Sequence, residues 1–169
     1  KTELLFFTDK CQVYKTKASA FDDTKASVLG DFIPVKLGFD ESENLIFMAV
    51  TESYEGYMLF IFKNGKAAKV PMSSYLTKTN RKKLANAYSG KHELIYISQI
   101  SEEVNVIIRS SSGKAIIFNT ALINAKTSRD TIGVQVLNLK ENDIAESAAQ
   151  INEDEIKKYK KYVYSKIPA

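Results

Sequence analysis

The stretch "LFIFKNGKAAKV" (residues 59–70) decides the fold of this chain. It begins with an apolar run and continues through the tripeptide Lys-Asn-Gly into a second run, in which lysine alternates with small residues. The apolar run at 57–62 is too short for a helix and rich in aromatic residues, which is typical of a strand covered on both faces. Asn64-Gly65 is a strong hairpin signal, because both residues tolerate the positive φ of tight turns. The stretch therefore predicts a β-hairpin.

Two further stretches have the same form: "FFTDKCQVYKT" at 6–16 and "IRSSSGKAIIF" at 108–118. Aligning the turns places Cys11, Gly65 and Gly113 in one column, 54 and 48 residues apart. Self-similarity at this period is typical of propeller blades or solenoid units. Where Cys11 replaces glycine, we expect the turn either to relax or to accept a cost of about 1 kcal/mol.

Each hairpin is followed by a polar, basic loop and two more predicted strands. The first of these strands are "FIPVKLGF" (32–39), "LANAYS" (84–89) and "IGVQVLNL" (132–139), and the final strands include "NLIFMAV" (44–50) and "ELIYISQI" (93–100). About four short strands per repeat is the size of a propeller-type blade, which buries its faces against its neighbours. The sequence therefore predicts an all-β, propeller-like array of about three four-stranded antiparallel blades.

The predicted organisation is a β-domain over residues 1–150 and a helical tail over 151–169. The repeats are expected at about 3–55, 56–103 and 104–150, with turns at 9–11, 63–65 and 110–113 and leading strands near 4–8, 57–62 and 104–109. In the tail, Asn152 and Glu155 have the spacing of a helix N-cap and capping box, which predicts a helix from about Glu153. Ile156, Tyr159 and Val163 would form an apolar stripe that caps the last blade. The alternative role of the tail is phosphate contact through Lys157, Lys158, Lys160 and Lys161.

Composition limits the class of protein. A chain of 169 residues with 44% hydrophobic content can bury one core of ordinary size. Its longest apolar run, "LIFMAV" at 45–50, is far shorter than the ~20 residues of a bilayer-spanning helix. One cysteine cannot form an internal disulfide, so we expect a cytoplasmic protein without membrane contact. The chain begins inside the first repeat, which is typical of a fragment.

The charges are segregated along the chain, and the net charge is +4. Between Tyr57 and His92 there are eight Lys or Arg residues and no acid, and between Val104 and Arg129 four basic residues again occur without an acid. Acids are concentrated in the second half of the first repeat and after Glu141. Such segregation creates a field that attracts a polyanion. The alternative for any single lysine is a solvated surface position.

Residues for catalysis are scarce. The sequence has one histidine, His92, and no second cysteine, so neither a metal site nor a catalytic triad can be assembled from them. The Gly-Lys pairs of "NGKAA" and "SGKAI" lack the earlier glycine and the following Ser/Thr of a phosphate-binding loop, and a hairpin turn explains them better. No catalytic residue, metal or cofactor is therefore expected in this chain.

The motifs together resemble a known family. The hairpins "LLFFTDKCQVYK", "YMLFIFKNGKAAKVP" and "VIIRSSSGKAIIF" resemble the blade signature F-x-T/K-x-x-G-K/R-x-x-K, and the third repeat continues with S/T-R-x-T-x-G-V-x-x-L-x-L. The second pattern is matched at Ser128, Arg129, Thr131, Gly133, Val134, Leu137 and Leu139. Both patterns are similar to those of the C-terminal β-pinwheel of the DNA gyrase and topoisomerase IV A subunits. The resemblance covers about residues 3–150, and "TKTNRKKLANAYS" (77–89) resembles the topoisomerase IV-type or clostridial-type version.

The resemblance implies a module that binds duplex DNA without sequence preference, bends or wraps it, and presents it for strand passage. It implies double-stranded DNA, the A-subunit core and the ATPase B subunit of a bacterial type IIA topoisomerase as partners, on the chromosome in the cytoplasm. ATP and Mg²⁺ would serve the parent enzyme, whose catalytic tyrosine lies in a part of the family's A subunit not matched here. The glycine-rich, arginine-containing box of gyrase is absent from this sequence, which favours a topoisomerase IV-like role over supercoiling. Two alternatives stay open: the parent enzyme can still be a gyrase, and the chain can be either a truncated piece or a natural short form.

Cations in two loops are the predicted DNA-binding residues. They are Lys78, Arg81, Lys82 and Lys83 before "LANAYS", and Lys126 and Arg129 before "IGVQVLNL". In a blade array equivalent loops emerge at equivalent positions, so we expect both clusters along one rim. Lys63, Lys66 and Lys114 at the hairpins are second choices. The competing function is a propeller-like protein-interaction module whose basic face meets an acidic partner.

Overall fold

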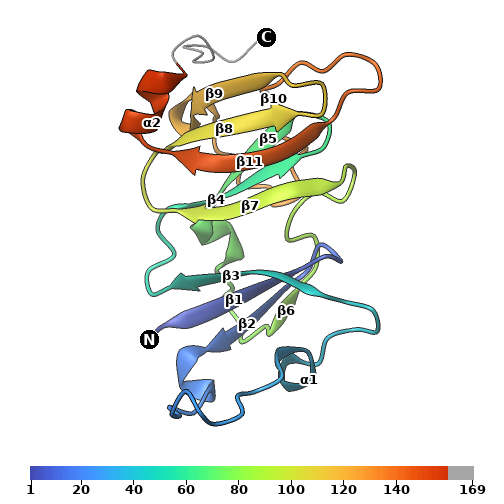
Figure 1. Cartoon of the computed structure of the whole chain (residues 1–169). Coiled ribbons are helices and arrows are strands. Elements are labelled where there is room, and N and C mark those ends of the chain that lie inside the picture. Colours follow the sequence, from blue (N-terminus) through green and yellow to red (C-terminus); the bar gives the residue numbers. More distant parts are fainter. Residues whose placement is uncertain (160–169) are drawn as a thin grey trace.

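The computed structural model describes residues 1–159, which form three antiparallel sheets stacked one above another (Figure 1). The strand orders are β3-β1-β2-β6, β10-β5-β4-β7 and β11-β8-β9. The strands are β1 (Glu3–Thr8), β2 (Val13–Lys17), β3 (Leu45–Thr51), β4 (Tyr57–Phe62), β5 (Lys66–Pro71), β6 (Lys83–Leu84), β7 (Leu94–Ile100), β8 (Asn105–Ser110), β9 (Ala115–Asn119), β10 (Val134–Gln135) and β11 (Ala145–Ile151). The helices are η1 (Ala18–Ala20), α1 (Ile33–Leu37), η2 (Met72–Tyr75), η3 (Thr120–Leu122) and α2 (Glu153–Lys158).

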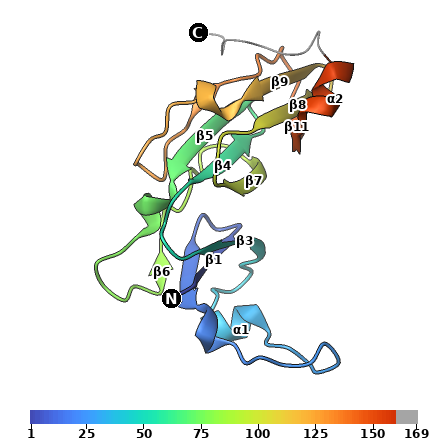
Figure 2. The same ribbon diagram turned by 90° about the vertical axis from the view of Figure 1, so that its left-hand side faces the viewer.

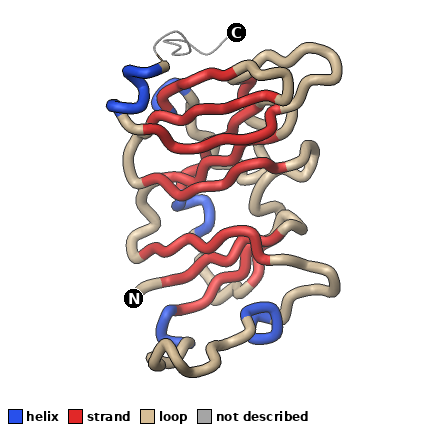
Figure 3. Tube along the Cα trace, viewed as in Figure 1, coloured by secondary structure: helices blue, strands red, loops and turns tan. Residues whose placement is uncertain are grey.

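The predicted all-β, propeller-like fold is confirmed, because strands and loops dominate and the helices are short (Figure 3). Each predicted hairpin is present: β1 pairs with β2, β4 with β5, and β8 with β9. The aligned turn residues Cys11, Gly65 and Gly113 have φ of 56°, 81° and 85°. Cys11 therefore keeps the left-handed turn and accepts its cost, while Asn64 is not among the residues with positive φ.

The fourth strand of a sheet comes from the following repeat. β6 belongs to the second repeat but pairs with β2 of the first sheet, and β10 belongs to the third repeat but pairs with β5 of the second sheet. The expectation that each repeat supplies all four strands of its own blade is therefore wrong for these strands. As a result, the third sheet has three strands within residues 1–159. At each junction between two sheets, a short strand of the following repeat pairs with the preceding sheet, and we call this arrangement a strand exchange.

The first repeat has a helix where the other two have the exchanged strand. "FIPVKLGF" (32–39) was predicted as a strand, but Ile33–Leu37 form α1. Pro34 stands at the start of this helix, where its missing N–H is tolerated, and Gly38 ends it with φ 68°. These local signals favour a helix over the predicted strand.

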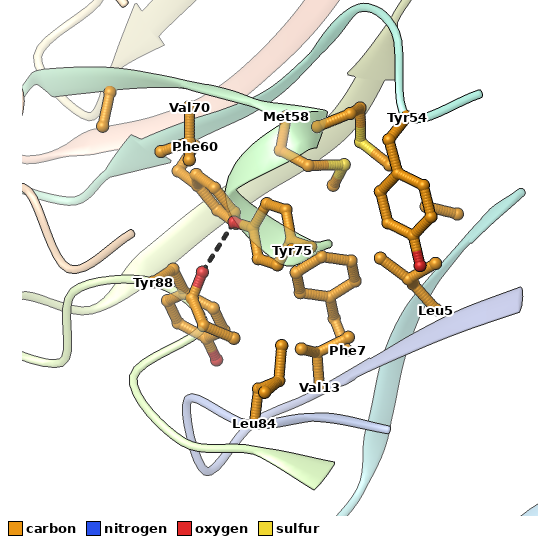
Figure 4. Close-up of a cluster of buried hydrophobic side chains, with 14 of the residues drawn as sticks. Leu5, Phe7, Val13, Tyr54, Met58, Phe60, Val70, Tyr75, Leu84 and Tyr88 are labelled. Carbon is orange, nitrogen blue, oxygen red and sulfur yellow. Dashed lines mark hydrogen bonds between the residues drawn. The ribbon is translucent and has the colours of Figure 1, made fainter. Parts of the chain in front are cut away.

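Apolar side chains between successive sheets form the core. Between the first and second sheets, Phe7 packs edge-on against Phe60 and Tyr75, with ring centroids 6.1 and 5.4 Å away (Figure 4). Tyr75 is fully buried, and its hydroxyl donates to the carbonyl of Ala87 at 2.7 Å. A second cluster, including Leu59 and Ile108, joins the second and third sheets. The sheets are thus held by their faces as well as by the exchanged strands.

The predicted helix at the end of the third repeat is confirmed within the described residues. α2 starts with a full capping box between Asn152 and Glu155. Ile156 and Tyr159 pack on a small cluster that contains Ile107, Ile117 and Ile151, so α2 covers the outer face of the third sheet. Val163, Lys160 and Lys161 lie outside the described residues. No helix within residues 1–159 has the length and apolar character needed to span a membrane.

Candidate nucleic-acid interface

Two loops result from the strand exchange and carry the predicted cations. The first-junction loop (76–82) leads from η2 to β6, and the second-junction loop (124–133) leads from η3 to β10. Each passes from its own sheet to the preceding one, and both lie on the left-hand side of Figure 2. The backbone N–H of Lys15 donates to Lys82 at 2.7 Å, and the N–H of Lys126 donates to Lys69 at 2.9 Å. Lys15 and Lys69 hold the same position in their hairpins, so the two loops contact equivalent sheet edges.

Three cations of the first-junction loop are exposed and unpaired. Lys78, Arg81 and Lys82 have no ion pair with any acid in residues 1–159. They line a cleft of about 600 Å³ whose other wall is the end of β2 and η1, from Lys15 to Ala20. Their charges are therefore available to an external anion.

Lys83, which follows directly, is engaged within the protein. Its Nζ lies 2.7 Å from the carboxylate of Asp40 and 5.4 Å from the centroid of the Tyr14 ring. The hydrogen bond to Asp40 raises the pKa of Lys83 and lowers the pKa of Asp40. Asp40 therefore neutralises much of the charge that the sequence offered for DNA contact.

Arg129 of the second-junction loop is directed into the protein. Its guanidinium donates to three backbone carbonyls of the second repeat: Nη1 to Ser74 at 3.0 Å, Nη2 to Ala85 at 3.2 Å and Nε to Asn86 at 3.3 Å. The guanidinium carbon also lies 6.0 Å from the Tyr75 ring centroid. Since one planar fork satisfies three carbonyls, Arg129 serves to hold η2 and the segment after β6 together.

Lys126 is the exposed cation of the second-junction loop and has no ion pair within the described part of the chain. The three hairpin lysines differ among themselves. Lys63 pairs with Glu93 at 2.8 Å, Lys114 donates to the carbonyl of Asn138 at 3.2 Å, and Lys66 is half-buried at the start of β5. The structure thus places the predicted residues in two loops, at the start of β6 and at two hairpin turns.

The sequence analysis did not identify two lysines of the first hairpin, Lys15 and Lys17, as residues of the site. Lys15 is buried, and its Nζ donates to the carbonyl of Tyr75 at 2.9 Å and to Oγ1 of Thr77 at 3.2 Å. Burial lowers the pKa of Lys15, and Glu3, 3.9 Å away, opposes this effect. Its hydrogen bonds fix the beginning of the first-junction loop.

Lys69 repeats this arrangement at the next junction, where its Nζ lies 2.7 Å from Glu103 and donates to the carbonyl of Thr120 at 3.0 Å. The shared hairpin position of Lys15 and Lys69 is a sequence signal for this structural role. Lys17 is different: it is exposed and lines the cleft, and nothing in the sequence links it to a loop some 60 residues away.

The site offers positive charge on a surface and in a cleft. Among residues 1–159 no group of three or more His, Cys, Asp or Glu side chains is placed to hold a metal ion. Contacts of exposed Lys and Arg side chains with phosphate oxygens carry no information on base sequence. The arrangement therefore suits a phosphate-bearing polyanion.

Comparison with known proteins gives the same family as the motifs. The family model described as the DNA gyrase C-terminal domain, beta-propeller, matches residues 2–27 and 105–152. The DNA gyrase A subunit of Streptomyces coelicolor is 26% identical over 148 residues, and the DNA topoisomerase 4 A subunit of Bacillus subtilis is 25% identical over 147 residues. These matches cover 83% and 85% of this chain but only 17% and 18% of the two relatives.

Solved structures with the same fold include a C-terminal domain of DNA topoisomerase IV, with a TM-score of 0.76 and 24% identity over 90% of this chain and 48% of that one. The E. coli ParC C-terminal domain has a TM-score of 0.69 and 10% identity over 98% of this chain and 74% of that one. The resemblance carried by the hairpin motifs is confirmed: this chain is similar in sequence to part of the DNA gyrase and topoisomerase IV A subunits, and its fold is that of their C-terminal domains.

Proposed function

We propose that this chain binds duplex DNA without sequence preference and bends or wraps it for a type II topoisomerase. The observation that carries the proposal is the set of unpaired, exposed cations Lys78, Arg81 and Lys82 on the first-junction loop. Lys126, exposed at the edge of the second sheet, adds a fourth cation, and we call these four residues the basic side. Binding through such cations gains affinity from counterion release and treats all duplex sequences alike.

The stack of sheets gives a reason for bending. The two loops emerge from successive sheets on the same side of the molecule (Figure 2), so a single duplex that contacts both must follow the stack. Contacts of this kind compensate the elastic cost of curving the duplex. The basic side would thus hold DNA along a path set by the sheets.

The chemistry of strand passage would belong to partner parts of the enzyme. We assign no catalytic residue and no cofactor to this chain, and place ATP, Mg²⁺ and the cleaving tyrosine in the A-subunit core and the B subunit of the parent enzyme. A topoisomerase IV-like enzyme, acting on the chromosome in the cytoplasm, is the favoured parent. The purified chain, mixed with supercoiled plasmid, ATP and Mg²⁺, should neither relax nor cleave it, and a protein-linked break would contradict this assignment.

The decisive experiment is a fluorescence anisotropy titration with random duplex DNA at several salt concentrations. If four to five cations contact phosphates, log K should fall with log salt at a slope of about −4, from the rule of about −0.9 per phosphate. Equal affinity for unrelated duplexes is expected. If the chain is instead an interaction module for an acidic protein, DNA will bind poorly at physiological salt, and strong sequence preference would contradict a wrapping role.

A further inference from the structure

The cleft beside the first-junction loop combines residues of two repeats. One wall is the end of β2 with η1, which contributes Lys17 and Ser19. The other wall is the first-junction loop, and Glu3 and Lys15 also line the space. We propose that this cleft seats one backbone phosphate of the bound duplex and that Lys17 is a DNA-binding residue. This inference rests on the proposed function and assigns a specific contact to it.

The charge balance of the cleft favours an anion. Its lining includes the cations Lys15, Lys17, Lys78, Arg81 and Lys82 and a single carboxylate, that of Glu3. This carboxylate already accepts a hydrogen bond from the hydroxyl of Tyr54 and lies 3.9 Å from Nζ of Lys15. Lys15 in turn donates to Tyr75 and Thr77. The other four cations, Lys17, Lys78, Arg81 and Lys82, form no ion pair with an acid within the described residues.

The shape of the cleft favours a phosphate group over a whole duplex. A space of about 600 Å³ admits a phosphodiester but not the width of a double helix. Concave walls of one charge sign focus the field on the ligand. Thr16, Ser19 and Thr79 line the same space, and their hydroxyl groups can donate hydrogen bonds to phosphate oxygens. Charge and donors thus converge on one small anion.

The second junction lacks the corresponding residues. Pro71 stands where Lys17 stands in the first hairpin, six residues beyond the aligned turn position. Arg129, the only arginine of the second-junction loop, is held by three carbonyls. The phosphate seat is therefore specific to the first junction, although the loops themselves are equivalent.

The test compares Lys17→Ala with Lys25→Ala, an exposed lysine of the same repeat that does not line the cleft. In the anisotropy titration, Lys17→Ala should shallow the salt slope by about 0.9 and weaken binding of random duplex several-fold. Lys25→Ala should leave both unchanged. Equal behaviour of the two variants, with wild-type binding intact, overturns the seat and leaves the proposed function standing.

A second arm separates failure of the seat from failure of DNA binding. Inorganic pyrophosphate is titrated into ¹⁵N-labelled wild type and into the Lys17→Ala/Arg81→Ala variant, and amide shifts are followed by NMR. Shifts concentrated at residues 15–20 and 77–82, lost in the double variant, support an anion seat. If pyrophosphate shifts these amides while duplex DNA does not bind, the proposed function fails and the DNA contact assigned to the cleft fails with it. Shifts absent from the cleft overturn the seat itself.

Discussion

The two junctions have the same backbone design but use their cations differently. At each, a loop passes to the preceding sheet and a short strand pairs with its edge. At the first junction three cations are exposed: Lys78, Arg81 and Lys82. At the second junction the guanidinium of Arg129 donates to three backbone carbonyls, which leaves Lys126 as the exposed cation of that loop. Position within a repeat therefore determines the path of the backbone, and local partners determine what a side chain does.

Gly133→Ala should have the largest effect, because it blocks the second junction itself. A Cβ at this position would lie 2.3 Å from the carbonyl oxygen of Ala67, at a φ of 75°. We expect loss of β10 pairing and a free energy of unfolding lowered by about 3–4 kcal/mol. Urea unfolding measures this, with Gly30→Ala as control, since no atom lies within 4 Å of that site. Equal midpoints for the two variants would contradict the described packing.

Arg129→Ala should lower the free energy of unfolding by about 2–3 kcal/mol, since it leaves three carbonyls without their charged donor. Arg109→Ala removes an exposed arginine from β8 and should change stability by less than about 0.5 kcal/mol. The folded Arg129→Ala protein should keep the wild-type salt slope for DNA. A shallower slope with unchanged stability would make Arg129 a DNA contact after all.

Lys126→Ala tests how far the basic side extends. Its side chain has no ion pair within residues 1–159, so its removal should shallow the salt slope by at most about 0.9 and leave unfolding unchanged. A reduction of two or more would shift the centre of DNA binding to the second junction.

Lys83→Ala should have the smallest effect. The ion pair with Asp40 is a surface pair, with side chains 40% and 56% exposed, and such pairs contribute about 0–1 kcal/mol. We expect a salt slope within about 0.3 of wild type, because the lysine is already neutralised by its partner. A loss equal to that of Lys126→Ala would show that DNA displaces Asp40.

The sequence revealed the hairpins because they depend on local signals. Gly65 and Gly113 mark turns with positive φ, and the apolar runs beside them are buried as predicted. The strand exchange escaped prediction because β6 and β10 have two residues each, too few for a recognisable period. The intramolecular partners of two cations could not be predicted either: Asp40 lies 43 residues from Lys83, and the carbonyls that hold Arg129 belong to another repeat. Such pairings exist only in the folded chain.

The central claim is that the first junction carries most of the DNA contact. The direct measurement is the salt slope of random-duplex binding for a Lys78→Ala/Arg81→Ala/Lys82→Ala variant, beside a charge-matched control in which the exposed Lys25, Lys91 and Lys140 become alanine. The first variant should lose about 2.7 from the slope and bind all duplex sequences more weakly, while the control stays within about 0.5 of wild type. Equal losses in the two variants would mean that binding is a diffuse effect of net charge, and would contradict the account.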